Sequence, residues 1–170
     1  MKTLKTKRLI IRAFKKKDAK GYFAVVSDEE TMRHIDWGPL ETIKEANDYI
    51  ANVIDSYKRG HLEWVVETKQ KRIIGSIVVY DSNERDKQIA YIFLKEIWGQ
   101  KYAKEAVSAV SDYLLSSGIA QVLHAKHAKT NPASGGVLKG SGFVFEKVVK
   151  NAFHAKWGEW IDCLQYIREK

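Results

Sequence analysis

The chain has 170 residues, of which 45% are hydrophobic and 29% charged, a globular balance that argues against disorder. Its length suits one domain, 1–170, that buries well over half of its unfolded surface. The formal net charge is +8, but the positive residues are spread along the chain without a helix-turn-helix or an aromatic RNA-binding motif, so a nucleic-acid partner is not expected.

Several classes of protein are excluded by what the sequence lacks. No apolar run approaches the roughly 20 residues of a membrane span, and the first residues lack the apolar core of a secretory signal, so we expect a cytoplasmic protein. Cys163 is the only cysteine, which excludes an intramolecular disulfide. The five histidines occur without a cysteine cluster or a His-Glu-x-x-His motif, so no metal site is expected.

The first half of the sequence predicts antiparallel strands and two helices. A strand over 8–13 leads into a helix that carries Tyr22 and Phe23, and 28–40 is mostly loop. Thr42 and Glu45 have the spacing of a capping box, which predicts a helix from there to about residue 58. Apolar runs at 62–67 and 73–80 flank a short polar turn and predict a hairpin.

The second half predicts a strand, a helix and a parallel strand. The apolar run 89–94 breaks at Trp98 and Gly99, and the amphipathic helix that follows stops at Gly118. A further strand ends near residue 128, and this order favours parallel pairing. A short helix from about Pro132 and strands at 143–149 and 159–167 complete an α/β domain with a mixed sheet.

A helix that follows a strand this closely creates an anion site. Its first-turn N–H groups and the positive end of its dipole point beyond the carboxyl end of the strand, where phosphates commonly bind. The backbone from Gly99 to Lys104 would form this cradle. An ordinary tight strand-to-helix turn is the alternative.

Two motifs resemble the GNAT superfamily of acetyl-CoA-dependent N-acetyltransferases. One is Trp-Gly-Gln-Lys-Tyr-Ala-Lys-Glu-Ala at 98–106, and the other runs from Asn131 through Ser134, Leu138 and Lys139 to Gly-Phe at 142–143. The closest branch is the Rim-type group, which includes ribosomal-protein N-terminal acetylases, and the similarity covers nearly the whole chain. The resemblance implies a mixed, mostly antiparallel sheet with a splayed parallel strand pair and helices on both faces.

The resemblance also implies acetyl-CoA as cosubstrate and identifies the residues that bind it. They are Phe93 and Leu94, whose backbone would pair with the pantetheine arm, the loop and helix residues Trp98, Gly99, Gln100, Lys101, Tyr102, Ala103 and Lys104, and finally Asn131, Ser134 and Lys139. Asn131 would bond the arm, and Ser134 would lie near the sulfur, where it could protonate the leaving thiolate. Asn-Pro-x-Ser is equally a good helix N-terminus without any catalytic role.

Acetyl transfer to an amine requires a neutral amine, a donor for the oxyanion and a proton for the thiolate. Glu63 is our tentative base, because it interrupts an otherwise apolar strand. Asp36, His34 and Tyr91 are alternatives near the expected acceptor cleft, and each of the four is also explained as structural or solvated. An α-amine, with a pKa of about 8, needs less help from a base than lysine, with a pKa of about 10.4.

Three departures from the family pattern leave the function open. Lys101 stands where the loop usually has glycine, Gln88 where the branch often has glutamate, and Gly135-Gly136 replaces better helix formers. The leading hypothesis is direct acetyl transfer in a ternary complex to a protein N-terminus or a small amine, and a homodimer is compatible with it. The alternatives are a degenerate CoA-binding or regulatory module without turnover and a basic nucleic-acid-binding domain.

Overall fold

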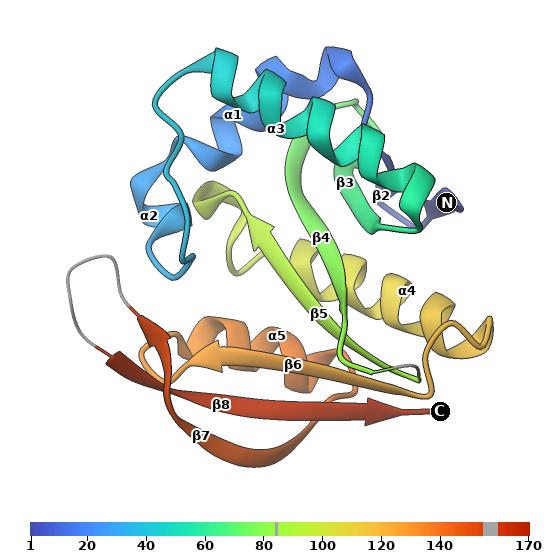
Figure 1. Cartoon of the computed structure of the whole chain (residues 1–170), viewed down its shortest axis with the longest axis vertical. Coiled ribbons are helices and arrows are strands. Elements are labelled where there is room, and N and C mark those ends of the chain that lie inside the picture. Colours follow the sequence, from blue (N-terminus) through green and yellow to red (C-terminus); the bar gives the residue numbers. More distant parts are fainter. Residues whose placement is uncertain (84, 155–159) are drawn as a thin grey trace.

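The computed structural model describes residues 1–83, 85–154 and 160–170, and their strands form one eight-stranded sheet in the order β1-β2-β3-β4-β5-β6-β8-β7 (Figure 1). The strands are β1 (Leu4–Lys5), β2 (Leu9–Ala13), β3 (Leu62–Thr68), β4 (Ile73–Asp81), β5 (Asp86–Phe93), β6 (Val122–Ala128), β7 (Val144–His154) and β8 (Trp160–Glu169). The helices are α1 (Ala19–Val26), α2 (Glu29–Met32), α3 (Ile43–Ser56), α4 (Tyr102–Ser116) and α5 (Pro132–Gly140), with short 3-10 turns at Lys16–Asp18, Tyr57–Arg59 and Lys95–Ile97.

The pairing of β5 with β6 is parallel, whereas the other described neighbours in the sheet pair antiparallel. This parallel ladder covers only three register pairs, Asp86–Val122, Lys87–Leu123 and Gln88–His124. Beyond them the two strands diverge, and the sheet opens toward their carboxyl ends (Figure 1). The expected mixed sheet with a splayed parallel pair is therefore confirmed.

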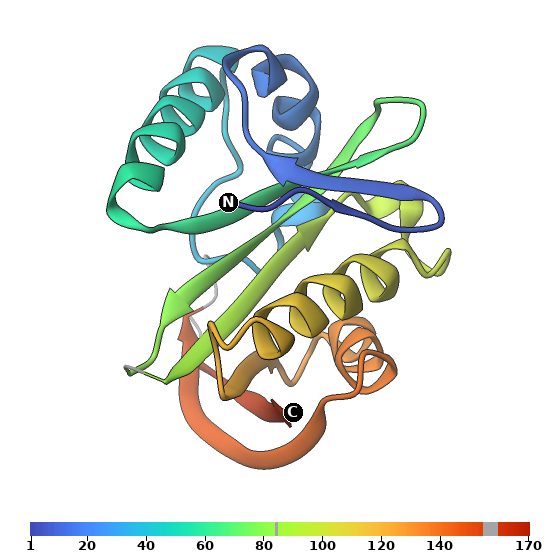
Figure 2. The same ribbon diagram turned by 90° about the vertical axis from the view of Figure 1, so that its right-hand side faces the viewer.

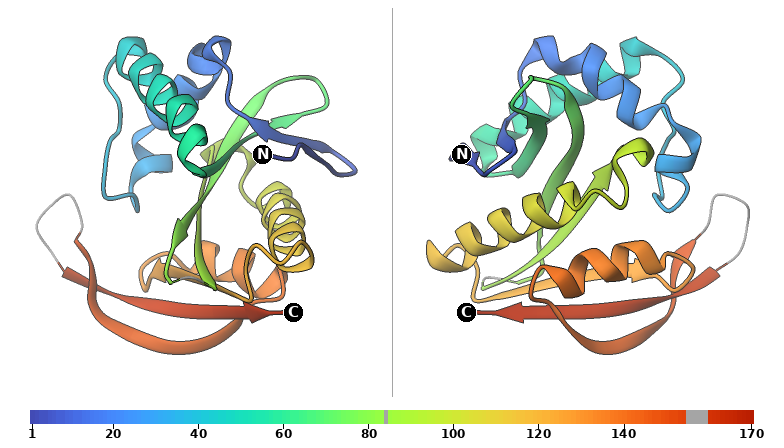
Figure 3. Two further views of the ribbon diagram at one scale, coloured as in Figure 1. Left: turned by 45° about the vertical axis from the view of Figure 1, so that its right-hand side comes forward. Right: turned by 180° about the vertical axis from the view of Figure 1, so that it is seen from behind.

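Successive side chains of the central strands point to opposite faces of the sheet, and their contacts show which helices cover each face. On one face the Tyr22 hydroxyl of α1 lies 2.9 Å from Ser76 Oγ, and Tyr49 of α3 donates to Glu63 Oε1 at 2.7 Å. On the other face Trp64, which follows Glu63, packs edge-on against Tyr113 of α4. Helices α1 and α3 thus cover one side, and α4 lies on the other (Figure 3).

The capping box at Thr42 is confirmed. Thr42 Oγ1 accepts from Glu45 N at 3.3 Å, and Glu45 Oε2 accepts from Thr42 N at 2.9 Å. The apolar face of α3 then buries Ala46 and Ile50 against the core. Among the described residues, no helix is long and apolar enough to cross a membrane.

The segment after α1 and the start of α4 differ from the sequence-based expectation. The predicted loop over 28–40 contains the short helix α2, because the Asp28 carboxylate accepts from Thr31 N at 2.7 Å and caps one turn. The helix expected directly after Trp98 and Gly99 begins only at Tyr102, after a 3-10 turn and a loop. The predicted start of the last strand, Glu159, lies outside the described residues.

Candidate active site

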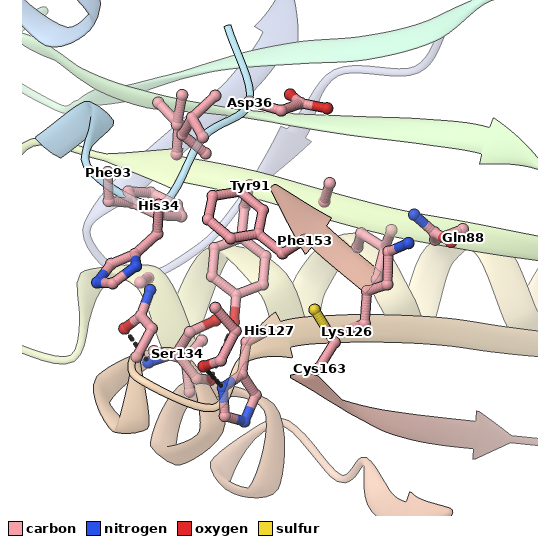
Figure 4. A pocket seen from close by; sticks show the side chains of 18 of the residues that line it. His34, Asp36, Gln88, Tyr91, Phe93, Lys126, His127, Ser134, Phe153 and Cys163 are labelled. Atoms are coloured by element: carbon pink, nitrogen blue, oxygen red, sulfur yellow. Dashed lines mark hydrogen bonds between the residues drawn. The ribbon is translucent and has the colours of Figure 1, made fainter. Parts of the chain in front are cut away.

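A cavity of about 530 Å³ occupies the opening between β5 and β6. Its walls come from the segment after α2, from β4, β5 and β6, from the first turns of α4 and α5, and from β7 and β8 (Figure 4). The backbone of β5 beyond Gln88 has no described strand partner on this side. The cavity therefore lies where the splay leaves main-chain polar groups without a neighbouring strand.

The cavity passes through the sheet from one face to the other. Tyr91 is in register with Ile77, which shares the α4 face with Trp64, and Tyr91 reaches Ser134 of α5 on that side. Gln88 is in register with Tyr80, three residues from Ile77 and thus on the α1 and α3 face. These cavity residues line one space, which therefore receives side chains from both faces of the sheet.

Ser134 and Tyr91 form a hydroxyl pair at the first turn of α5. The two oxygens lie 2.8 Å apart, and the Tyr91 hydroxyl is also 3.0 Å from the Ser134 carbonyl (Figure 4). Asn131 caps the helix, since its Oδ1 accepts from Ser134 N at 3.2 Å. Burial raises the pKa of Tyr91 well above its ordinary value, so this phenol stays protonated and is suited to donate a hydrogen bond.

His127 explains the glycine at the next position of α5. The imidazole is buried on β6, its Nδ1 lies 2.9 Å from the Ala128 carbonyl, and its Nε2 has no hydrogen-bond partner among the described residues. A Cβ at Gly135 would come within 2.6 Å of Nε2, whereas a Cβ at Gly136 would meet nothing within 4 Å. Gly135 therefore lets α5 pack directly on the ring, and the helix, predicted to be short, spans nine residues.

The loop between β5 and α4 adopts backbone conformations that favour glycine. Gly99 has φ 76° and Lys101 has φ 65°, both in the left-handed region. The Trp98 indole Nε1 donates to the Phe93 carbonyl at 2.7 Å and ties the start of the loop to the end of the strand. The first amides of α4 follow with no intrahelical carbonyl to accept them, and they form the N-terminal end of a helix of 15 residues.

The four candidate bases occupy different places. Glu63 does not line the cavity: it lies beneath α3, where Tyr49 donates to Oε1 at 2.7 Å and His61 Nε2 lies 3.1 Å from Oε2. Burial raises the pKa of the Glu63 carboxyl. His34 and Asp36 line the cavity from the segment after α2, and burial together with the nearby Arg33 charge lowers the pKa of His34.

The expected cofactor residues divide into two groups. Those that line the cavity are Phe93, Trp98, Ala103, Asn131 and Ser134. The others lie beyond its lining, on the loop, α4 and α5: Leu94, Gly99, Gln100, Lys101, Tyr102, Lys104 and Lys139. Sequence reasoning missed Lys126, His127 and Phe153 as cavity residues, although the buried alternation of Leu123 and Ala125 indicates which face of β6 carries His127.

The comparisons agree with this architecture. The family model described as Acetyltransferase (GNAT) domain matches residues 8–144. The uncharacterized N-acetyltransferase YoaA of Bacillus subtilis is 31% identical over 152 residues, which cover 86% of this chain and 85% of that protein. The uncharacterized N-acetyltransferase p20 of Bacillus licheniformis is 26% identical over 170 residues, 98% of this chain and 95% of that one.

Solved structures share the fold at lower identity. RimL, a ribosomal alpha-N-protein acetyltransferase in complex with coenzyme A, superposes with a TM-score of 0.88 at 18% identity over 99% of this chain and 98% of that one. Spermidine N-acetyltransferase from Vibrio cholerae, in complex with CoA and spermine, gives 0.82 at 20% identity over 96% of each chain. The match of the family model over most of the chain, with these likenesses, shows that the protein belongs to the GNAT family of acetyl-CoA-dependent acetyltransferases.

Proposed function

We propose that this acetyltransferase moves the acetyl group of acetyl-CoA to a primary amine by direct attack in a ternary complex. The observation that carries the proposal is the cavity through the sheet, which has the Ser134 and Tyr91 hydroxyls on one face and Tyr80 and Gln88 on the other. An acyl donor and an acceptor can reach its centre from opposite sides, so no residue has to carry the acetyl group between them.

The residues present fit the chemistry of acetyl-CoA. The loop from Trp98 to Lys101 and the first amides of α4 supply N–H donors and the positive end of a helix dipole for the pyrophosphate. The unpaired edge of β5 ahead of Phe93 supplies main-chain groups for the amides of the pantetheine arm. The bound thioester supplies an activated acetyl group, and Asn131 and Ser134 flank the cavity where the arm would end.

The Ser134 and Tyr91 hydroxyls are the groups that would provide a proton to the leaving thiolate of CoA. The amine nitrogen attacks the thioester carbonyl and releases a proton to His34, the C–S bond breaks, and the thiolate takes the Ser134 proton. The Tyr91 phenol, kept protonated by its raised pKa, hydrogen-bonds the Ser134 hydroxyl across the 2.8 Å contact, and solvent water returns the proton that Ser134 gives up. A serine hydroxyl alone is a weak acid, and the Tyr91 contact gives it a partner.

His34 has the properties of the base. It lines the cavity, and its lowered pKa keeps the imidazole neutral near pH 7 and able to accept a proton from an ammonium group. We expect His34→Gln to lower kcat/KM and to remove the acidic limb of its pH profile. An unchanged acidic limb in this variant would assign that limb to the substrate amine or to another group.

The preferred acceptor is a protein N-terminal α-amine, as in the name of the structurally similar RimL. An α-amine is partly neutral near pH 7 and needs only a weak base. The other candidate is a small amine, in keeping with the spermidine enzyme of similar fold. The net charge of +8 and Lys126 in the cavity disfavour a polycationic acceptor by like-charge repulsion.

The proposal is tested by measuring turnover of acetyl-CoA with peptides that carry a free α-amine, with peptides blocked at the N-terminus but containing lysine, and with spermidine. We expect the free α-amine peptides to be acetylated, and Ser134→Ala to lower kcat by about tenfold or more with nearly unchanged CoA affinity. Ser116→Ala, at the exposed end of α4, is the matched control. Binding of acetyl-CoA without turnover of any amine would instead identify a CoA-binding module.

A further inference from the structure

Strands β1 and β2 form a hairpin, the N-terminal hairpin, and side chains from it converge on the first turn of α4, outside the cavity. The Glu105 carboxylate receives Thr6 Oγ1 at 2.6 Å and Arg8 N at 2.9 Å on Oε1, and Arg8 Nε at 2.6 Å on Oε2. Thr6 is itself fixed, because its Oγ1 accepts from Leu9 N at 3.0 Å. Both carboxylate oxygens of Glu105 are thus used by a segment nearly a hundred residues earlier in the chain.

The same arginine reaches the loop that precedes α4. Arg8 Nη1 donates to the Gln100 carbonyl at 3.0 Å, and the guanidinium lies over the Tyr102 ring at 4.0 Å. Figure 2 shows the hairpin, in dark blue, beside the start of α4, in yellow. Arg8 therefore contacts residues on both sides of Lys101, the strained lysine of the loop.

The bonds that this loop makes itself run back toward β5: Trp98 N donates to the Lys95 carbonyl at 2.9 Å, and Gln100 Nε2 donates to the Glu96 carbonyl at 3.0 Å. The Gln100 amide donates to the Ile97 carbonyl at 3.3 Å, a long contact, and the left-handed conformations at Gly99 and Lys101 prevent regular helical bonding there. The Glu105 carboxylate in the first turn would also repel an anion bound at the helix N-terminus. Arg8 Nε lies 2.6 Å from Glu105 Oε2 and neutralises that charge, while Arg8 Nη1 holds the loop through the Gln100 carbonyl.

We propose that Arg8, held in place by Thr6 and Glu105, is a positioning residue that fixes the 98–101 loop for the pyrophosphate of acetyl-CoA. This inference rests on the proposed function, since it assigns the loop to that group. Arginine suits the task because its planar fork bonds the carboxylate and the Gln100 carbonyl at once while it stacks on Tyr102.

The test compares a cosubstrate that has the pyrophosphate with one that lacks it. For Arg8→Gln we expect kcat/KM for acetyl-CoA to fall about tenfold, mainly through KM, and kcat/KM for acetyl-pantetheine to stay within about twofold. Arg168→Gln is the matched control, because Arg168 also pairs with a carboxylate of α4, Asp112, but far from the loop. It should leave the ratio between the two cosubstrates unchanged.

Equal losses of kcat/KM with both cosubstrates would overturn the inference, because a purely structural role of Arg8 affects both cosubstrates alike. No loss with either cosubstrate would also overturn it. Thr6→Val keeps the side-chain volume and provides a second route if Arg8→Gln does not fold; it should weaken the binding of acetyl-CoA without weakening that of acetyl-pantetheine. Arg8→Lys restores the charge without the fork, so a full rescue would show that only charge matters.

The proposed function can fail separately. Calorimetric binding of CoA and of pantetheine needs no acceptor, so it tests Arg8 even if no amine is acetylated. Loss of CoA affinity in Arg8→Gln with unchanged pantetheine affinity supports the inference in that case, and equal changes refute it.

Discussion

Replacing Lys101 by glycine tests how the loop accommodates a side chain at a left-handed position. At φ 65° a non-glycine residue carries a strain of about 1–2 kcal/mol, which Lys101→Gly removes. Glycine also stabilises the unfolded chain through its greater freedom, by about 0.4–1 kcal/mol. The difference predicts a gain of roughly 0–1.6 kcal/mol in the free energy of unfolding, which for a chain of this size raises Tm by about 0–6 °C.

Lys71 provides the control, because it has φ 66° in the exposed turn between β3 and β4, away from the cavity. Lys71→Gly should raise Tm by a similar amount without changing CoA affinity. For Lys101, calorimetry at low and high salt separates the two effects of the side chain. Lys101→Gly should bind CoA at least as tightly as the wild type at high salt, and Lys101→Ala should be the weakest of the three, since it loses the charge but keeps the strain.

Two results would refute this reasoning. If Lys101→Gly abolishes CoA binding at every ionic strength, the lysine side chain is a required ligand and the loop is not a backbone cradle. If Lys71→Gly raises Tm while Lys101→Gly lowers it by several degrees, the left-handed conformation at Lys101 is not a source of strain in this loop.

Further predictions concern stability. Gly135→Ala should lower the free energy of unfolding by about 1–3 kcal/mol through its clash with His127, whereas Gly136→Ala, with open space around its Cβ, should raise it by about 0.5–1 kcal/mol; urea unfolding measures both, and equal effects would contradict the packing. Burial alone raises the pKa of Glu105, but hydrogen bonds from the N-terminal hairpin lower it overall, so its stabilisation is present above the unfolded pKa of 4.5 and lost as pH falls through the folded value. The stability difference between wild type and Glu105→Gln should therefore shrink below pH 4.5 in acid titrations, and a difference that grows on acidification would refute this sign. Acetyl-CoA at a hundredfold excess over its Kd should add about 2.7 kcal/mol, and the absence of any thermal shift at millimolar concentration would count against the proposed function.

Local patterns predicted the elements of this fold well. The capping box at Thr42 and the hairpin over 62–67 and 73–80 each depend on residues close together in sequence, and the structure has both within a residue or two. The helix α2 was missed because a single turn capped by Asp28 has too few residues to show periodicity. Strand β7 extends to His154, beyond the predicted 149, because its pairing with β8 continues past an irregular stretch.

The site depended more on contacts between distant segments. Sequence reasoning selected Glu63 because a carboxylate in an apolar strand is unusual, but the partner that accounts for it, Tyr49, comes from α3. The sequence alone indicates that Gly135 is unfavourable for a helix. The close contact with His127 of β6 explains why a glycine is needed there. The residues around Arg8 form no motif that predicts its role, because that role depends on its bonds to Glu105 and Gln100, which are distant in the sequence.

The short parallel ladder between β5 and β6 also has a consequence for hydrogen exchange. Strands β1 to β5 and strands β6 to β8 come from separate stretches of the chain, and three register pairs join them within the described sheet. Amides on the open edge of β5 have no strand partner beyond Gln88, so in the free protein they should exchange faster than the amides paired with β4. A pantetheine arm lying along that edge would act as a surrogate strand, and protection appearing there upon binding would mark, residue by residue, where the cosubstrate completes the sheet.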